Sequence, residues 1–447
     1  MIIRAVFLLA ALTLGATACE RSSPTDSPSA APGPSADLDA LARQYVQLAL
    51  AFDRHDPDYV DAYFGEEDLL RAAEADTRGL PELRAQADAL LDAVAALDAG
   101  SLAEPERLRL GTLAKRLRAM RLRMDIVDPE RDAALRPFDE ESRVLFDAVA
   151  PDYDDAHFEA IVARIDALVP GEGPLRERLE AYRAQFVIPP ERLEAVFGAA
   201  IEECRRRTLA HIELPAAERF TVEYVTDKPW NAYNWYQGGY SSLIQINTDL
   251  PIRIERAVDL GCHEGYPGHH VQSVLLEREL VEGRGWPEFA LLPLFGPQAP
   301  LFEGGGNYGV ELAFPAEERL AFERDVLFPL AGLDPSTAER YHELLAALDE
   351  LRYARNEAAR DYLNGDITRE QAAAWQVQYA LLSEGEAARS MRFIDTYRSY
   401  VINYNLGEDL VRGHVETLAG ADPQRRWAEY ERLLSLPFAP SDLVRRQ

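Results

Sequence analysis

A proline inside a histidine-rich stretch is the feature that most constrains how this chain can fold. The stretch Gly261–His270 reads G-C-H-E-G-Y-P-G-H-H and holds three of the eight histidines. Proline has no backbone N–H and breaks the hydrogen-bond ladder of an α-helix, so a helix that carries His263 must bulge or restart at Pro267. On a straight helix, His263 and His269 would lie about 240° apart at roughly 100° per residue.

The residue types in this stretch are those of a hydrolytic metal site. Neutral imidazoles hold a divalent ion such as zinc, and a neighbouring carboxylate accepts a proton from the metal-bound water. The familiar motif is H-E-x-x-H on one helix. Here His263 and Glu264 begin a longer version of it, so we predict His263 and His269 as ligands, with His270 as the alternate. The structural alternative is a helical corner with hydrogen-bonded histidines.

A zinc site with two histidines needs a third protein ligand. Glu303 is the best candidate, because the segment after His269 is long enough to return to the histidines, and Glu311 is the alternate. Three glycines, 304–306, follow Glu303, and each costs about 1 kcal/mol relative to Ala in a helix. We therefore expect a ligand or a neighbouring helix to approach the backbone there. A glycine-rich loop beside a solvated acid is the alternative.

Aromatic residues recur at helical spacing in a segment predicted as a helix over 392–406. A tyrosine hydroxyl can stabilise the oxyanion formed during amide hydrolysis, and arginines can bind a substrate carboxylate. The alternative is that the aromatic stripe only packs in the core. The predicted oxyanion donors are Tyr397, Tyr400 and Tyr404, and the predicted substrate-binding residues are Arg392, Arg398 and Tyr308.

Apolar residues recur at three- and four-residue steps through most of the chain, which predicts amphipathic helices. Between residues 220 and 248 the period changes to two, and we predict strands at Phe220–Tyr224 and Ser242–Asn247. An exposed edge there can pair with extended substrate backbone; the alternative is a hairpin that covers the core. We predict a mainly α, two-lobed fold with a deep cleft and a small antiparallel β-sheet beside the metal site. The predicted lobes are a helical N-terminal lobe over 38–215 and a catalytic lobe over 216–447.

The first residues have the pattern of a bacterial export signal. Arg4 precedes a compact apolar run, Ala5–Gly15, and small residues then lead to Cys19. We predict a lipoprotein signal peptide over 1–19 with Cys19 lipidated, and plain signal-peptidase cleavage is the alternative. Residues 20–37 are rich in Ser, Pro and Ala and predict a disordered tether. Glu20 after the cysteine favours the outer membrane, with the protein facing the periplasm.

The charge of the chain excludes some partners. A net charge of −29 argues against nucleic acid and anionic membrane surfaces, so we expect membrane association only through the lipid anchor. Cys204 and Cys262 can form a disulfide in an oxidising compartment, but we favour two buried free thiols. Cys262 is a weak candidate for a metal ligand because it points about 100° away from His263 on a helix.

Taken together, the motifs resemble a bacterial family known as domain of unknown function 885. The resemblance rests on H-E-G-Y-P-G-H-H, on the E-G-x-x-x-Y of 303–308, on Arg392 and on the Y-N-L-G of 404–407, and it extends from about residue 37 to the C-terminus. The chain departs from the family at Gly305, where a Trp usually stands, and at Glu311, which is one residue late. These departures leave the pocket shape and the substrate open.

That resemblance implies a helical zinc metallopeptidase, distantly similar to oligopeptidases and carboxypeptidases that carry H-E-x-G-H and a downstream Glu. It implies Glu264 as general base and, as ligands, His263, His269 and Glu303. We predict one zinc ion or another divalent metal, a peptide substrate, and Glu264 moving a proton from water to the leaving amine. The alternatives are a zinc hydrolase of a non-peptide amide or ester, and a non-catalytic binding lipoprotein with a degenerate metal site.

Overall fold

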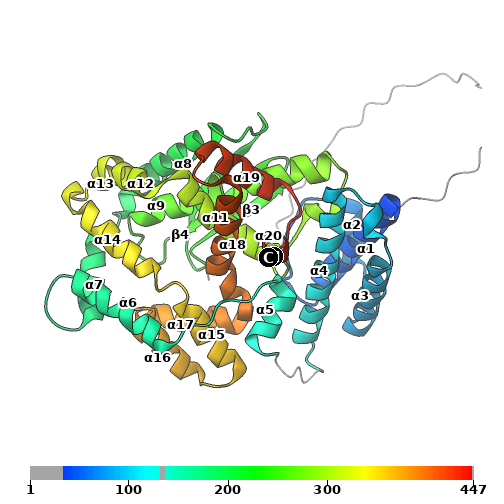
Figure 1. The fold of residues 1–447 in the computed structure, drawn as a ribbon, viewed down its shortest axis with the longest axis horizontal. Helices are drawn as coiled ribbons and strands as arrows, with labels where there is room; N and C mark the ends of the chain where they lie inside the picture. The colour runs from blue at the N-terminus through cyan, green and yellow to red at the C-terminus, as the bar shows by residue number, and fades with distance from the viewer. Residues whose placement is uncertain (1–33, 131–135, 229, 445–447) are drawn as a thin grey trace, which may run out of the picture.

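A computed structural model describes residues 34–130, 136–228 and 230–444, and its fold is mainly helical, as predicted (Figure 1). The predicted signal peptide, the lipidation site Cys19 and the tether up to residue 33 lie outside the described residues. Helix α1 (Pro34–Phe52) begins within the last residues of the predicted tether, with a proline at the start of a helix where its missing N–H costs nothing. The tether itself stays a prediction. No helix of the described part is both long and apolar enough to cross a bilayer.

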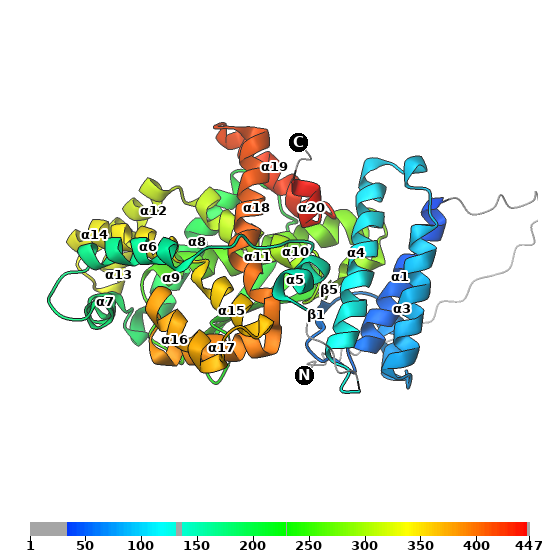
Figure 2. The same ribbon diagram turned by 60° about the horizontal axis from the view of Figure 1, so that its bottom comes forward.

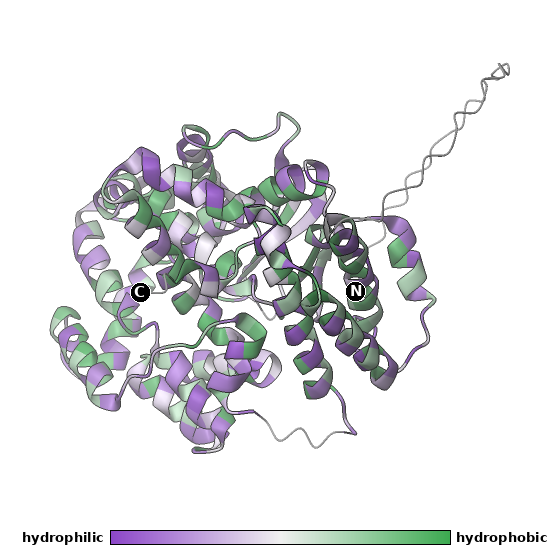
Figure 3. Cartoon of the chain, turned by 45° about the vertical axis from the view of Figure 1, so that its right-hand side comes forward, coloured by the Kyte–Doolittle hydropathy of each residue, from purple (hydrophilic) through white to green (hydrophobic). Residues whose placement is uncertain are grey.

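Three long N-terminal helices lie side by side on one flank of the molecule: α1, α3 (Leu80–Ala95) and α4 (Glu104–Ile126) (Figure 2). Their apolar stripes face one another, with Leu48, Leu83 and Leu117 fully buried. Hydrophilic and hydrophobic residues are mixed along the helices at the outside of the molecule (Figure 3). The other helices before the large sheet are α2 (Glu67–Glu74), α5 (Phe138–Phe146), α6 (Asp155–Leu168), α7 (Leu175–Arg183) and α8 (Leu193–Leu209).

Two large hydrophobic cores hold the fold together. The first joins the N-terminal helices to residues from 291 to 402, and it includes Phe146 and Tyr400. The second joins α8 to the central and C-terminal helices, and it includes Cys262 and Leu301. The buried apolar residues of the histidine motif, such as Cys262 and Tyr266, belong to the second core, whereas Tyr400 belongs to the first. The predicted division into lobes at residue 215 stays a prediction.

The larger sheet differs from the prediction. Its strand order is β2-β4-β3, with β2 (Arg219–Val225) parallel to β4 (Ser241–Asn247) and β3 (Ala232–Gly238) antiparallel to β4. The sheet is thus mixed rather than antiparallel, because the segment between the two predicted strands forms a third strand, β3, at the sheet edge. A second, antiparallel sheet pairs β1 (Val60–Tyr63) with β5 (Leu291–Pro293).

Helices α11 (Ala299–Ala313) and α18 (Ile402–Ala419) cross at very short distance. A Cβ atom on Gly304 would collide with the backbone of Gly407, so glycines at this crossing let the two helix backbones touch. The other α-helices that follow α11 in the described chain are α12 (Ala316–Phe322), α13 (Phe328–Ala331), α14 (Ala338–Asp349), α15 (Ala354–Asn364), α16 (Arg369–Tyr379), α17 (Glu384–Tyr397), α19 (Pro423–Ser435) and α20 (Pro440–Leu443).

Candidate metal centre

The backbone through the histidine motif is irregular, as the proline predicts. Helix α9 (Glu255–Leu260) continues into one π-helical turn, η4 (Gly261–Gly265), and a new helix, α10 (His269–Leu276), begins after a break with a cis peptide bond at Tyr266–Pro267. At the break, a Cβ on Gly268 would overlap the carbonyl of His263, so only glycine fits there. The bulge and the restart bring two histidines together that a straight helix would hold apart.

A disulfide fixes the start of this motif. Cys262 bonds to Cys204 of α8, with the two Cα atoms 5.5 Å apart. The expectation of two free thiols was therefore wrong, because the packing of α8 against η4 places the two side chains together in the second core. The bond also removes Cys262 as a metal ligand.

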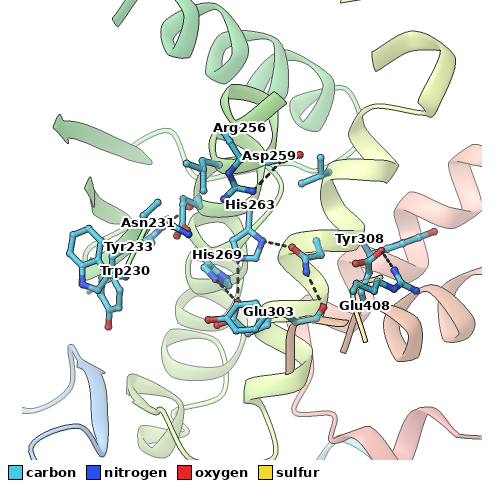
Figure 4. Close-up of a pocket in the computed structure, with 18 of the residues that line it drawn as sticks. Trp230, Asn231, Tyr233, Arg256, Asp259, His263, His269, Glu303, Tyr308 and Glu408 are labelled. Atoms are coloured by element: carbon cyan, nitrogen blue, oxygen red, sulfur yellow. Dashed lines mark hydrogen bonds and ion pairs between the residues drawn. The ribbon is translucent and has the colours of Figure 1, made fainter. Parts of the chain in front are cut away.

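Three ligand-type side chains converge beside the break (Figure 4). Oε2 of Glu303, on α11, lies 3.3 Å from Nε2 of His263 and 3.8 Å from Nε2 of His269. One ligand atom from each residue lies within 4.8 Å of the others, and this is the one such group found among the described residues. The structure thus brings together the three residues predicted as ligands.

The spacing and the chemistry of this triad fit a zinc ion. With Zn–N and Zn–O bonds of about 2.0–2.1 Å, tetrahedral ligand atoms lie about 3.3 Å apart, close to the distances from Glu303 to the two histidines. Two imidazoles and one carboxylate are also the donor set of a catalytic zinc site, which leaves a fourth position for water or substrate.

Hydrogen bonds behind the triad fix the orientation of two of its members. Nδ1 of His263 donates a hydrogen bond to Asn307 Oδ1 at 2.9 Å. This bond orients the ring so that Nε2 faces Glu303. The Asn307 amide in turn donates to the backbone carbonyl of Tyr404 at 2.9 Å. The Tyr400 hydroxyl donates to Oε1 of Glu303 at 2.9 Å, so the other carboxylate oxygen is the one that faces the histidines.

The charges within the triad favour a cation. Burial lowers the pKa of His269 to about 3, so this imidazole is neutral at neutral pH and its lone pair is available. Burial also lowers the pKa of His263, but its hydrogen bond to Glu303 and the charges of Glu264 and Glu303 outweigh burial and hold the pKa above its usual value. Burial raises the pKa of Glu303, but the contacts with the two histidines hold it below its usual value, so the site keeps a carboxylate.

The three glycines after Glu303 have different surroundings, and two of them are required by close contacts. A Cβ on Gly306 would lie 2.7 Å from Nδ1 of His263, so this glycine makes room for the ligand ring. Gly304 allows the contact with α18 described above. At Gly305 the nearest atoms to a Cβ are 3.4 Å and 3.6 Å away, which is ordinary packing distance. The expectation of close approach is confirmed for two of the three glycines.

The predicted base, Glu264, lines the same cleft as the triad. Asn234 of β3 donates to its backbone carbonyl at 2.6 Å, which ties the sheet to the motif. Burial raises the pKa of Glu264 to about 7; the charge of His263 opposes this shift and the charge of Glu303 adds to it. A carboxyl group with such a pKa can both accept and return a proton near neutral pH.

The alternate ligand His270 is not part of the triad. Its Nδ1 lies 2.8 Å from Ser242 Oγ, and its Nε2 lies 3.2 Å from Glu218, which also accepts from Tyr266. The order of these bonds is that of a Ser-His-Glu hydrolase triad, but Ser242 and His270 are almost completely buried and none of the three lines the cleft. We interpret this network as structural support for the motif.

Two further sequence candidates are engaged elsewhere. Glu311, the alternate third ligand, pairs with Arg412 on α18 at 2.7 Å, because two turns along α11 carry it away from the histidines. Arg398, predicted to bind substrate, forms a buried ion pair with Glu141 at 2.7 Å and does not line the cleft. The helix predicted over 392–406 is interrupted at Arg398, where φ is +54°, and this break turns the side chain toward Glu141. Its predicted role in substrate binding stays a prediction without support from its position.

The remaining candidates line the cleft. The Tyr400 hydroxyl is hydrogen-bonded to Glu303. The hydroxyls of Tyr397 and Tyr404 make no hydrogen bond to other described residues and are available to a substrate. Arg392 is exposed at the cleft wall. Tyr308 also lines the cleft, but it is 2% exposed and Arg412 lies over its ring, so it forms a wall.

The cleft itself has a volume of about 3290 Å³. Pockets for small molecules usually measure about 300–1,000 Å³, so this cleft has room for a polymeric ligand. Edge strand β3 and the triad line it together.

Sequence reasoning missed Asn307 and Asn234. Asn307 follows Glu303 by one helical turn, so the i, i+4 rule would place it on the ligand face. Asn234 carries no such signal, because its contact depends on where β3 lies.

The chain matches no known family model, and no curated protein is similar to it in sequence. Two solved structures have a partly similar fold. One is a proposed lipoprotein from Colwellia psychrerythraea, with a TM-score of 0.49 and 16% identity over 89% of this chain and 74% of that chain. The other is a proposed lipoprotein of unknown function from Shewanella oneidensis, with a TM-score of 0.43 and 16% identity over 84% of this chain and 77% of that chain. Likenesses at this level carry no argument about activity, so the resemblance to the domain of unknown function 885 family stays a prediction.

Proposed function

We propose that this chain is a zinc-dependent hydrolase that cleaves peptides. The observation that carries the proposal is the convergence of His263, His269 and Glu303, with Nε2 of both histidines within 3.8 Å of one carboxylate oxygen, on the wall of a large cleft. Zinc held by these three residues would supply a Lewis acid at the cleft wall.

The side chains around the triad have separate roles in this proposal. Asn307 and Tyr400 orient two ligands and thereby define which atoms face the ion. Glu264 is the proton carrier: it accepts the proton of the attacking water and returns it to the leaving amine. Tyr404 and Tyr397 offer their hydroxyls to the oxyanion of the carbonyl under attack.

The cleft supports a peptide over a smaller substrate. Its volume is about three times the upper end of the usual range for small-molecule pockets. The edge strand β3, which lines the cleft, also offers backbone groups that can pair with an extended chain.

The test is a comparison of two conservative substitutions. Glu264→Gln should keep the metal but lower turnover of a mixed peptide substrate by at least about a hundredfold, which is within the usual range for a proton-transfer group. Glu311→Gln is the matched control: it removes the same charge from the same cleft, at a residue that pairs with Arg412 instead of the triad. Undiminished turnover in Glu264→Gln, with metal bound, would refute the proposed function.

Export and lipid anchoring through Cys19 are part of the proposal and rest on the sequence alone. Mass spectrometry of the mature protein should find a lipid-modified Cys19 at the N-terminus; an unmodified N-terminus elsewhere would contradict the anchor.

A further inference from the structure

The cleft contains a small group of unpaired arginines. Carboxylates outnumber Arg and Lys side chains among the residues that line it. Most of the basic residues there are neutralised: ion pairs to neighbouring acids are formed by Arg71, Arg183, Arg256, Arg319, Arg352 and Arg426. By contrast, Arg355, Arg389 and Arg392 make no ion pair with any described carboxylate. All three lie on one wall, formed by α15 and α17.

Of these three arginines, Arg355 is the one whose guanidinium is held by neighbouring side chains. Its Nε donates to Ser390 Oγ at 3.1 Å, and its guanidinium carbon lies 5.9 Å from the centre of the Phe393 ring. One edge of the guanidinium is therefore fixed while its terminal nitrogens have no acidic partner. Burial lowers the pKa of Arg355, which shows that the protein gives little compensation for the charge. A half-buried cation without a partner is costly unless a ligand supplies the anion.

Tyr404 connects this arginine to the triad. The Tyr404 phenol interacts electrostatically with Glu303 and Glu264 as well as with Arg355. Its ring lies 6.0 Å from that of Tyr400, whose hydroxyl bonds to Glu303. The Phe393 ring, which Arg355 contacts, lies 6.3 Å from the Tyr404 ring, so a row of aromatic side chains connects Arg355 to Glu303. An anion bound there would lie within a short stretch of extended peptide from the bond under attack.

We propose that Arg355 binds the terminal carboxylate of a peptide substrate, so that the site removes short fragments from C-termini; this rests on the proposed function. A guanidinium binds a carboxylate through two parallel hydrogen bonds, and that fork matches a terminal carboxylate held in one place. The acid-rich remainder of the cleft disfavours peptides with many acidic side chains. One localised cation near the triad suits a substrate that carries one anion at its end.

The experiment measures binding, so it does not depend on turnover. Three probes are titrated into the full chain carrying Glu264→Gln: N-acetyl-tetra-alanine, its C-terminal amide, and the amide of N-acetyl-Ala-Ala-Ala-Glu. The free acid should bind at least about tenfold more tightly than either amide, because only the free acid can form a charged hydrogen-bonded pair with the guanidinium. Equal binding of the first two probes overturns the proposal. If the glutamyl amide binds as tightly as the free acid, the site reads a side chain and the proposal is likewise overturned.

Substitutions then assign the effect to Arg355. Arg355→Gln should abolish the preference for the free acid, and Arg355→Lys, which keeps the charge without the fork, should retain only part of it. Arg71→Gln is the control, because Arg71 lines the cleft but pairs with Glu67 at an exposed rim. Circular dichroism verifies that each variant is folded. A preference that survives in folded Arg355→Gln overturns the assignment.

The two proposals fail separately. If the free acid binds tightly through Arg355 but Glu264→Gln cleaves the mixed peptide substrate as fast as the wild-type protein does, the subsite stands and the proposed function fails. If turnover depends on Glu264 while free-acid and amide peptides are cleaved equally fast at internal bonds, the hydrolase stands and the C-terminal subsite is overturned.

Discussion

Gly306 offers a sharp test of how the triad is built, because the space that its missing side chain leaves is occupied by a ligand ring. In Gly306→Ala, the new methyl group would lie 2.7 Å from Nδ1, 2.8 Å from Cε1 and 3.0 Å from Cγ of His263. These distances are too short for non-bonded atoms, so the imidazole must rotate or shift. Either movement weakens its bond to Asn307 and turns Nε2 away from Glu303.

The expected magnitudes are different for folding and for metal binding. Overpacking costs about 1–3 kcal/mol, while alanine in place of glycine gains about 1 kcal/mol in a helix, so Gly306→Ala should lower the free energy of unfolding by at most about 2 kcal/mol. Metal affinity should fall by about 10–100-fold, the range seen when the support of a ligand is lost. The larger effect is therefore on the ion.

The neighbouring glycine gives the control. In Gly305→Ala the new methyl group would lie 3.4 Å from Leu434 and 3.6 Å from Gln272, so this variant should be as stable as the wild type or more stable and should bind zinc unchanged. Zinc affinity is measured by competition with a chromophoric chelator, and stability by thermal unfolding. If Gly306→Ala binds zinc as tightly as Gly305→Ala, the ring does not need the space and the reasoning fails.

Three further predictions follow from single contacts. The disulfide between Cys204 and Cys262 closes a separation of 58 residues, which corresponds to about 4 kcal/mol in the chain-entropy model, so Cys204→Ser should lower the melting temperature in oxidising buffer; an unchanged melting temperature would contradict this. Tyr400→Phe removes the hydrogen bond to Glu303 and should lower zinc affinity by about tenfold in the chelator assay, whereas equal affinity would show that the phenol does not position the ligand. Burial raises the pKa of Asp53 to about 6, above its value of about 3.9 in the unfolded chain, so the stability from this group is present below about pH 4 and lost as the pH rises through 6. Asp53→Asn should therefore raise the melting temperature at pH 8 but not at pH 4, and a rise at both values would rule out titration as the cause.

Local chemistry made much of the candidate site predictable. His263, Glu264 and Glu303 follow from residue type and spacing, and Pro267 alone requires the irregular backbone that the structure shows. The choice between His269 and His270 was open, because it depends on how the chain leaves the break. In the structure His269 lies beside Glu303, whereas the buried His270 is hydrogen-bonded to Ser242.

Contacts between segments far apart in the chain could not be predicted from the sequence pattern. The disulfide joins Cys204 to Cys262 through the packing of two helices, and no local signal specifies it. The parallel pairing of β2 with β4 depends on β3 occupying the far edge, and the aromatic composition of β3 obscured its period. Arg355 lies on α15, whose spacing of apolar residues is that of any amphipathic helix. Only the fold shows that Arg355 forms no ion pair with a described carboxylate in the cleft.

The central claim is that His263, His269 and Glu303 hold one divalent ion, and elemental analysis of the purified protein tests it most directly. After incubation with zinc and removal of the excess, the wild-type chain should retain about one zinc per molecule, and folded His263→Ala should retain almost none. Zinc-free wild-type protein, or equal retention in folded His263→Ala, would contradict the assignment of these residues as the metal centre.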